Sequence, residues 1–228
     1  MRFFNSHICG GTLIADRWVL IAAHCFRRSR SSWHWQVKLG EYSLTTPSST
    51  EFIIRVKNIF VHERYDSNVQ TDDITLLELE RPVALDGSES HIKPICLPPV
   101  GFEIRTGFDC VATGWGKSQN GPIVTDILQK IKQPLLDYQK CAEVWKGIGW
   151  PITDKQLCLG DLKSEVGVCS GDSGGPVQCA LPNNQWMQVG VTSWTTNTCI
   201  HPGFAAVFTR VSSYLDWIQN TIAQHTKN

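Results

Sequence analysis

The chain has 228 residues, and its 21 basic and 21 acidic residues give a formal net charge of zero at pH 7. This balance gives no electrostatic reason to expect nucleic acid or an anionic membrane as a partner. No apolar run approaches the eighteen or so residues that a transmembrane helix needs, and residues 1–6 are too short and polar for a secretory signal.

Short β-rich runs alternate with turn residues along most of the chain. Residues 35–39 alternate apolar and polar side chains, residues 52–56 are rich in β-branched side chains, and residues 188–194 form another strand candidate. Many short strands separated by loops favour a barrel or a sandwich, either as two small domains or as one larger all-β unit.

Two segments have a helical pattern instead. Apolar residues at positions 211, 214, 215, 218 and 222 predict a terminal amphipathic helix that packs on the body of the protein. Residues 137–143 predict a shorter helix, for which Asp137 supplies the N-terminal cap.

Three short motifs carry candidate chemistry, and they follow in the order His24, Asp73, Ser173. A serine hydroxyl is a weak nucleophile at neutral pH and needs an adjacent base such as histidine, which an aspartate in turn orients. Each motif alone has an ordinary explanation, because a histidine in an apolar run is usually a packed core residue and Gly-Asp-Ser-Gly can be a simple turn. Together they match the order of one class of serine hydrolase.

On these motifs the chain resembles the chymotrypsin/trypsin-like serine protease family, from Cys9 to the terminal helix. The resemblance implies an all-β fold of two antiparallel Greek-key β-barrels with a C-terminal α-helix. Residues 1–228 would form a single serine protease domain, with the first barrel over about 1–105 and the second barrel and helix over 106–228. The active site would lie between the barrels.

The resemblance also implies the catalytic roles. His24, Asp73 and Ser173 would form the triad of a serine endopeptidase that works through an acyl-enzyme, and the backbone N–H groups of Gly171 and Ser173 would form the oxyanion hole. Asp72 and Asp73 are neighbours whose side chains point in opposite directions on a strand, and alignment on the family pattern selects Asp73.

The specificity pocket is predicted through the same alignment. Gly167, six residues before Ser173, would be its uncharged floor, Val168 an apolar wall, and Thr195 and Ala206 would narrow it. Small or medium aliphatic residues are therefore expected before the scissile bond, as in elastases. The segment Ser193-Trp194-Thr195 is expected to pair with the substrate backbone as an added strand.

The nine cysteines suggest an oxidising compartment, and hence a secreted or extracellular protein. The resemblance implies four disulfides and leaves Cys96 over. That cysteine would either bond an upstream chain segment that this sequence lacks or remain a buried free thiol. The implied pairs are Cys9 with Cys25, Cys110 with Cys179, Cys141 with Cys158, and Cys169 with Cys199.

In the resembled family a new N-terminal ammonium pairs with the aspartate that matches Asp172. No activation site precedes Cys9, so the sequence is interpreted as truncated and weakly active or inactive by itself. The alternative is a catalytically silent homologue that binds a partner. Expected partners are protein or peptide substrates and protease inhibitors. No cofactor or metal is expected, because the loop from Glu41 to Glu51 has few carboxylates for calcium.

Overall fold

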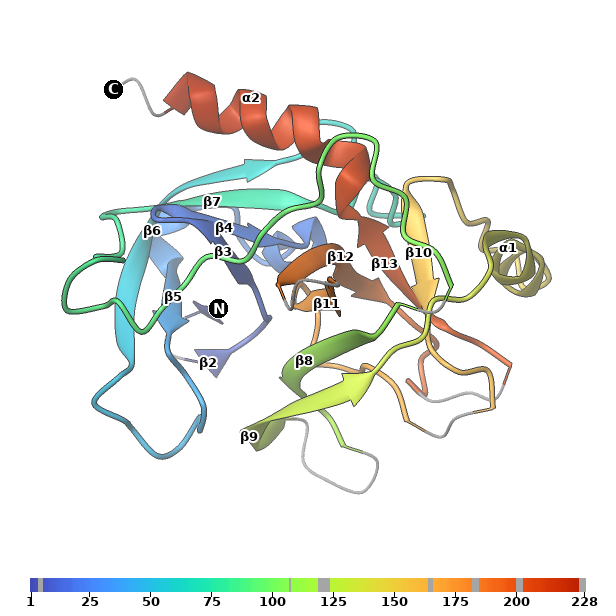
Figure 1. Ribbon diagram of the computed structural model, residues 1–228, viewed down its shortest axis with the longest axis horizontal. Coiled ribbons are helices and arrows are strands. Elements are labelled where there is room, and N and C mark those ends of the chain that lie inside the picture. Colours follow the sequence, from blue (N-terminus) through green and yellow to red (C-terminus); the bar gives the residue numbers. More distant parts are fainter. Residues whose placement is uncertain are drawn as a thin grey trace.

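The computed structural model describes residues 1–3, 6–106, 108–118, 124–163, 166–181, 185–199 and 203–225. Two antiparallel β-sheets, one from each half of the chain, lie side by side in Figure 1, with a helix across one end. The predicted all-β class of two antiparallel units with a C-terminal helix is confirmed.

The first sheet has the strand order β2-β1-β5-β6-β7-β4-β3. Two of its strands were predicted from the sequence. β5 covers the predicted residues 35–39, and β6 extends well beyond the predicted 52–56. All residues of β4 and β7 are buried. β4 is apolar throughout, whereas β7 also buries Thr75 and Glu78, and the Glu78 carboxylate pairs with Lys57 at 2.8 Å. The strands are β1 (Arg2–Phe3), β2 (Ser6–His7), β3 (Thr12–Ala15), β4 (Trp18–Ile21), β5 (Trp35–Leu39), β6 (Phe52–Val61) and β7 (Thr75–Leu79).

The second sheet has the order β10-β13-β12-β11-β8-β9. Its central strand β12 contains the predicted segment 188–194 and pairs with both β11 and β13. The strands are β8 (Cys110–Gly116), β9 (Val124–Lys132), β10 (Gln156–Leu159), β11 (Pro176–Ala180), β12 (Trp186–Trp194) and β13 (Ala206–Arg210).

Two α-helices and three 3-10 turns complete the described elements. The cap of α1 (Tyr138–Lys146) is the predicted one, because the Lys140 N–H donates to Asp137 Oδ1 at 3.1 Å. The predicted terminal helix begins as a 3-10 turn and continues as α2 (Leu215–His225). The 3-10 turns are η1 (Ala23–Phe26), η2 (Ser32–His34) and η3 (Val211–Tyr214).

Although α2 follows the second sheet in sequence, it packs on the core of the first. Tyr214, Leu215 and Ile218 are buried in the same apolar cluster as Leu20 and Leu76. This contact ties the end of the chain to the first sheet, so the two halves share one folded body (Figure 1).

Four disulfides lie within the described residues: Cys9–Cys25, Cys110–Cys179, Cys141–Cys158 and Cys169–Cys199. They are the pairs that the resemblance implied. Closing a loop of the size between Cys9 and Cys25 is worth roughly 3 kcal/mol in the chain-entropy model. Cys96 is a free cysteine and is exposed, so the alternative of a buried thiol is wrong.

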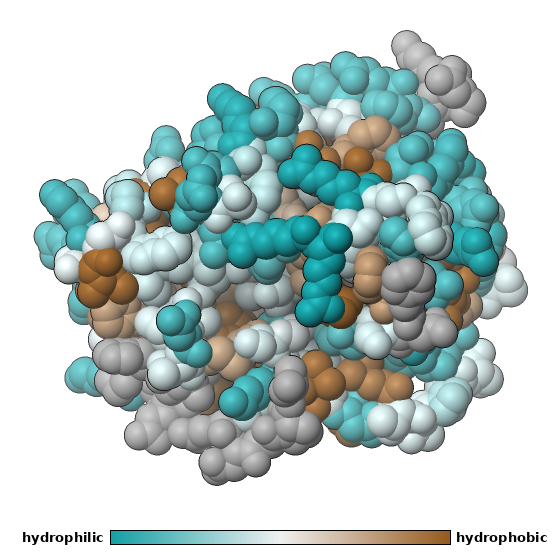
Figure 2. All heavy atoms as spheres, turned by 180° about the vertical axis from the view of Figure 1, so that it is seen from behind, coloured by the Kyte–Doolittle hydropathy of each residue, from teal (hydrophilic) through white to brown (hydrophobic). Residues whose placement is uncertain are grey.

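The surface is mixed in character. On the face shown in Figure 2, hydrophobic residues gather in small groups between hydrophilic side chains. None of the helices in the described part of the chain is long and apolar enough to cross a membrane.

Candidate active site

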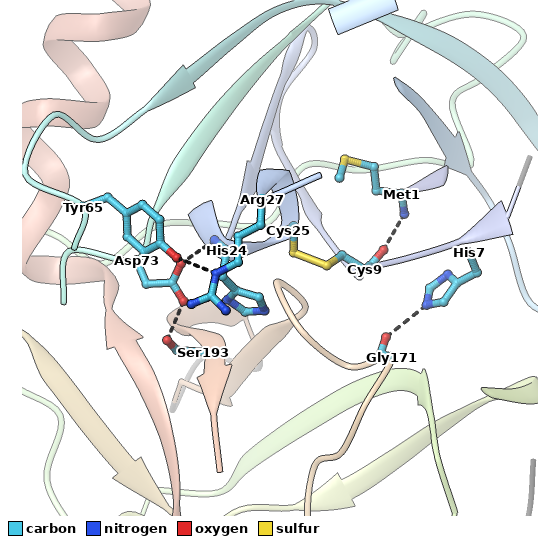
Figure 3. Close-up of a disulfide and its surroundings, with 10 residues drawn as sticks. All are labelled: Met1, His7, Cys9, His24, Cys25, Arg27, Tyr65, Asp73, Gly171 and Ser193. Carbon is cyan, nitrogen blue, oxygen red and sulfur yellow. Dashed lines mark hydrogen bonds and ion pairs between the residues drawn. A yellow bond between two sulfur atoms is a disulfide. The ribbon is translucent and has the colours of Figure 1, made fainter. Parts of the chain in front are cut away.

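His24 and Asp73 come together because β4 and β7 are paired neighbours. Ile21 at the end of β4 lies opposite Thr75 at the start of β7. His24 follows the first strand by three residues and Asp73 precedes the second by two, so both reach the same end of the ladder. The η1 turn then directs the His24 side chain toward the carboxylate (Figure 3).

The Asp73 carboxylate is completely buried and well supplied with donors. It accepts the His24 backbone N–H at 2.8 Å on Oδ1, and the His24 Nδ1–H at 2.7 Å on Oδ2. The hydroxyl of Ser193 also donates to Oδ2, at 2.5 Å, and the Thr209 hydroxyl donates to the Asp73 carbonyl at 2.8 Å. Such bonds stabilise a buried negative charge. They also fix the His24 tautomer, leaving Nε2 as the free acceptor.

Ser173 lies in a turn that is pressed against the His24 segment. Gly174 has a φ of +74°, and a Cβ there would lie 2.6 Å from Ile21 Cγ1 and 3.1 Å from Cys25 Sγ. The Gly10 N–H donates to the Ser173 carbonyl at 2.8 Å, which ties the turn to the Cys9–Cys25 disulfide. Among the described residues no hydrogen bond joins Ser173 Oγ to His24. Such catalytic bonds are often long without substrate.

The N–H groups of Gly171 and Ser173 have no hydrogen-bond acceptor in the part of the chain that the structure describes. Gly171 takes a φ of +100°, which favours glycine. Its carbonyl accepts a 3.0 Å hydrogen bond from His7 Nε2 (Figure 3), and the His7 ring packs edge-on against Trp115. Burial lowers the pKa of His7 to about 4, so the ring is neutral at pH 7 and can donate this bond.

The Asp172 carboxylate is bound by residues of the second half of the chain. Its carboxylate accepts the Gly116 N–H at 2.8 Å and the Cys169 N–H at 2.9 Å. Burial raises the pKa of this carboxyl, and no basic group within the described ranges forms an ion pair with it. A pocket of about 220 Å³ opens beside Asp172, lined in part by Gly114, Lys117 and Val166.

Comparison with known proteins decides the family. A model described as Trypsin matches residues 1–218. The chain belongs to the trypsin family. The mouse protein "Transmembrane protease serine 7" is 36% identical over 228 residues, which cover 97% of this chain and 26% of that protein. The chain therefore spans about a quarter of the length of this relative, which is itself described as a serine protease.

The residues expected to form the specificity pocket of a trypsin-family protein lie in two places. Val168 and Ala206 are buried in the second apolar core, and Gly167 and Val168 line the pocket beside Asp172. Thr195 donates to the Cys199 carbonyl at 3.3 Å and is half-buried, as is Trp194. Thr195 and Ala206 do not line the pocket beside Asp172.

Two groupings within the described residues bear on a metal site. His24, Cys9 and Cys25 are close together, but both sulfurs are in a disulfide and supply no thiolate. In the loop that resembles the calcium loop of the trypsin family, the Lys38 ammonium lies 2.6 Å from a Glu41 oxygen and 2.9 Å from a Glu51 oxygen. Within the described residues, the single ammonium of Lys38 is thus shared between the two carboxylates.

Sequence reasoning missed two contacts of this site. The Ser193 side chain was expected only within a strand that pairs with substrate, yet its hydroxyl bonds Asp73. His7 matches no catalytic motif, and the sequence did not indicate that it bonds the carbonyl of Gly171. The sequence offers no local signal for either, because the partners are 120 and 164 residues away.

Proposed function

We propose that this chain is a serine endopeptidase domain that cleaves peptide bonds through an acyl-enzyme at Ser173. The proposal depends on one observation: His24 and Asp73 are joined by two hydrogen bonds, and the His24 segment packs against the turn that carries Ser173. The pair orients Nε2 of His24 as a base. The whole chain would act as one protease domain, because the first half supplies His24 and Asp73 and the second half supplies Ser173.

In the proposed reaction, His24 Nε2 takes the hydroxyl proton while Ser173 Oγ attacks the scissile carbonyl. The oxyanion that forms accepts hydrogen bonds from the N–H groups of Gly171 and Ser173, and losing one such donor typically costs about 100- to 1,000-fold in rate. Protonated His24 then delivers its proton to the leaving amine. Water attacks the acyl-enzyme in a second passage through the same groups.

We also propose that Asp172 receives an ammonium group, which the family uses to set the oxyanion turn. The buried carboxylate, its raised pKa and the adjoining pocket support this role. An ammonium would supply the missing counter-charge of a buried carboxylate, a partner whose loss typically costs about 3 to 5 kcal/mol. Turnover would therefore require the charged pair at Asp172.

The proposed preference before the scissile bond is for small or medium aliphatic residues. It rests on the uncharged Gly167, and on Thr195 and Ala206 at positions where glycines in trypsin- and chymotrypsin-like relatives leave room for large side chains. The four disulfides support an extracellular site of action, because they persist in oxidising compartments. An exposed Cys96 is available for a disulfide with a segment outside this sequence.

The test uses the natural full-length protein after proteolytic activation, with peptides that carry Ala, Val, Leu, Phe or Arg before the scissile bond. Turnover at Ala, Val or Leu that disappears in Ser173→Ala is the expected result. Turnover mainly at Arg would overturn the pocket assignment and leave the protease assignment standing. Absence of turnover by folded protein would favour the silent homologue, which is supported by the lack of a basic partner for Asp172 among the described residues.

A further inference from the structure

A group of arginines borders the candidate active site on the side of the first sheet. Arg27, Arg28 and Arg30 follow His24 within six residues, and all three are exposed. None of them forms an ion pair with an acidic residue within the described part of the chain. We call these three residues the arginine rim.

Arg27 is held in place without losing its positive charge. Its backbone N–H donates to the His24 carbonyl at 3.3 Å, so it directly continues the η1 turn. Its side chain donates to the Ser67 carbonyl at 3.0 Å and to the Tyr65 hydroxyl at 3.4 Å. All of these acceptors are neutral. The guanidinium therefore has a defined direction, and its charge is still available to a ligand.

Two residues of the rim, Arg27 and Arg30, line a hollow of about 450 Å³. Ala23, next to His24 in the chain, lines it too, together with Phe26, Ser29, Tyr65 and Ser67. No carboxylate lines this hollow. Arg30 also lines the next hollow, where its neighbours come from β6 and α2 and are again not acidic. Asp66 stands between the lining residues Tyr65 and Ser67, but it does not line the hollow and forms no ion pair with the rim among the described residues.

Tyr65 links the rim electrostatically to the candidate catalytic pair. Burial raises the pKa of its hydroxyl, the charge of Asp73 raises it further, and Arg27 and Arg30 act in the opposite direction. The Tyr65 hydroxyl thus lies within electrostatic reach of both Asp73 and the rim. Figure 3 shows Arg27, Tyr65 and Asp73 around His24.

We propose that the arginine rim selects protein substrates with acidic residues close to the scissile bond. This inference rests on the proposed protease function and names its substrate class. A chain with no net charge has no general attraction for acidic partners, so the selection must be local. Guanidinium groups bind carboxylates in a forked geometry, and exposed charges act over about 8 Å at physiological salt.

The test compares two peptides that share a valine before the scissile bond and are flanked on both sides by either glutamate or glutamine. The activated full-length protein should cleave the glutamate peptide with a kcat/KM about three- to tenfold higher, since a few exposed ion pairs contribute modestly. Raising the salt concentration should bring the ratio toward one. This salt series needs no variant, so it remains informative where a variant fails to fold.

The double variant Arg27→Gln/Arg30→Gln should bring the ratio close to one, and Arg27→Lys/Arg30→Lys should retain a preference because it keeps the charges. Arg105→Gln, which removes an exposed arginine outside the rim, is the matched control and should keep the full ratio. A ratio of one in the unmodified protein, or a ratio that the glutamine variant leaves intact, overturns the inference.

Cleavage of the glutamine peptide distinguishes a failure of the proposed protease function from a failure of the proposed role of the arginine rim. If neither peptide is cleaved, the protease assignment fails, and binding of the same two peptides to Ser173→Ala protein then decides about the rim. Tighter binding of the glutamate peptide that Arg27→Gln/Arg30→Gln removes supports an acidic partner. Equal binding of the two peptides overturns it.

Discussion

Each carboxylate oxygen of Asp73 accepts a hydrogen bond from His24, one from the backbone N–H and one from the imidazole. This double attachment fixes both the position and the tautomer of the histidine. It depends on the register of β4 and β7, in which Ile21 lies opposite Thr75. The geometry of the candidate active site is thus set by strand pairing as well as by the residues themselves.

Removing the Ser193 hydroxyl should destabilise the protein through Asp73. Ser193→Ala leaves the buried Oδ2 of Asp73 with one donor fewer, and we expect a loss of about 1–3 kcal/mol in the free energy of unfolding. Urea denaturation measures this loss. The matched control is Ser213→Ala, which removes an exposed hydroxyl in η3. Equal stabilities of the two variants would contradict the importance of the bond.

Gly174→Ala should displace the serine turn. The left-handed φ alone costs an alanine about 1–2 kcal/mol, and the clash with Ile21 and Cys25 adds about 1–3 kcal/mol of overpacking. Gly101→Ala is the matched control, since Gly101 has a φ of +77° and nothing within 4 Å of its added Cβ. The Tm of Gly174→Ala should be well below the Tm of Gly101→Ala. The opposite order would show that the turn is not tightly packed.

Asp172 should make the protein less stable as the pH rises. Because burial raises its folded-state pKa, the folded protein keeps this proton over a range where the unfolded chain has lost it. Stability from this group is therefore present at low pH and is lost as the pH rises through the folded pKa. The Tm of the unmodified protein minus the Tm of Asp172→Asn should be more positive at pH 4 than at pH 7. Asp216→Asn, at an exposed position in α2, should show no such trend.

His7 should have the opposite pH dependence. Its folded-state pKa is lowered to about 4, so between about pH 4 and 6.5 the unfolded chain binds a proton that the folded protein does not. Stability from His7 is therefore present above the unfolded pKa and is lost as the pH falls toward 4. His7→Phe should remove this part of the pH dependence in thermal unfolding measurements, and an unchanged profile would contradict it. Since Phe also lacks the donor to Gly171, His7→Gln is the variant that can retain that bond.

Local sequence patterns predicted much of the fold. The alternation in residues 35–39 identifies β5, and Asp137 caps α1 as expected. The apolar spacing from position 211 predicted the terminal helix but did not distinguish the initial 3-10 turn from α2. Both kinds of helix place residues three apart on the same face, so the apolar pattern is the same in either. It also did not show that this helix packs on the first sheet.

The candidate site was predictable only where a motif carries it. His24, Asp73 and Ser173 stand in recognisable motifs, whereas the bond from Ser193 to Asp73 depends on how the second sheet packs against the first. The arginine rim is visible in the sequence as three nearby charges. The proposed role of the rim depends on the absence of acidic residues from the lining of the hollow, and only the described structure shows that lining.

The most direct test of the central claim is the reaction of Ser173 with a fluorophosphonate probe in the activated full-length protein, followed by mass spectrometry of the labelled peptide. We expect stoichiometric labelling at Ser173 and a large loss of labelling in His24→Ala, because the hydroxyl needs its base. If Ser173 stays unlabelled in the folded protein, both with His24 and with His24→Ala, the protease assignment is wrong and the protein is a silent homologue.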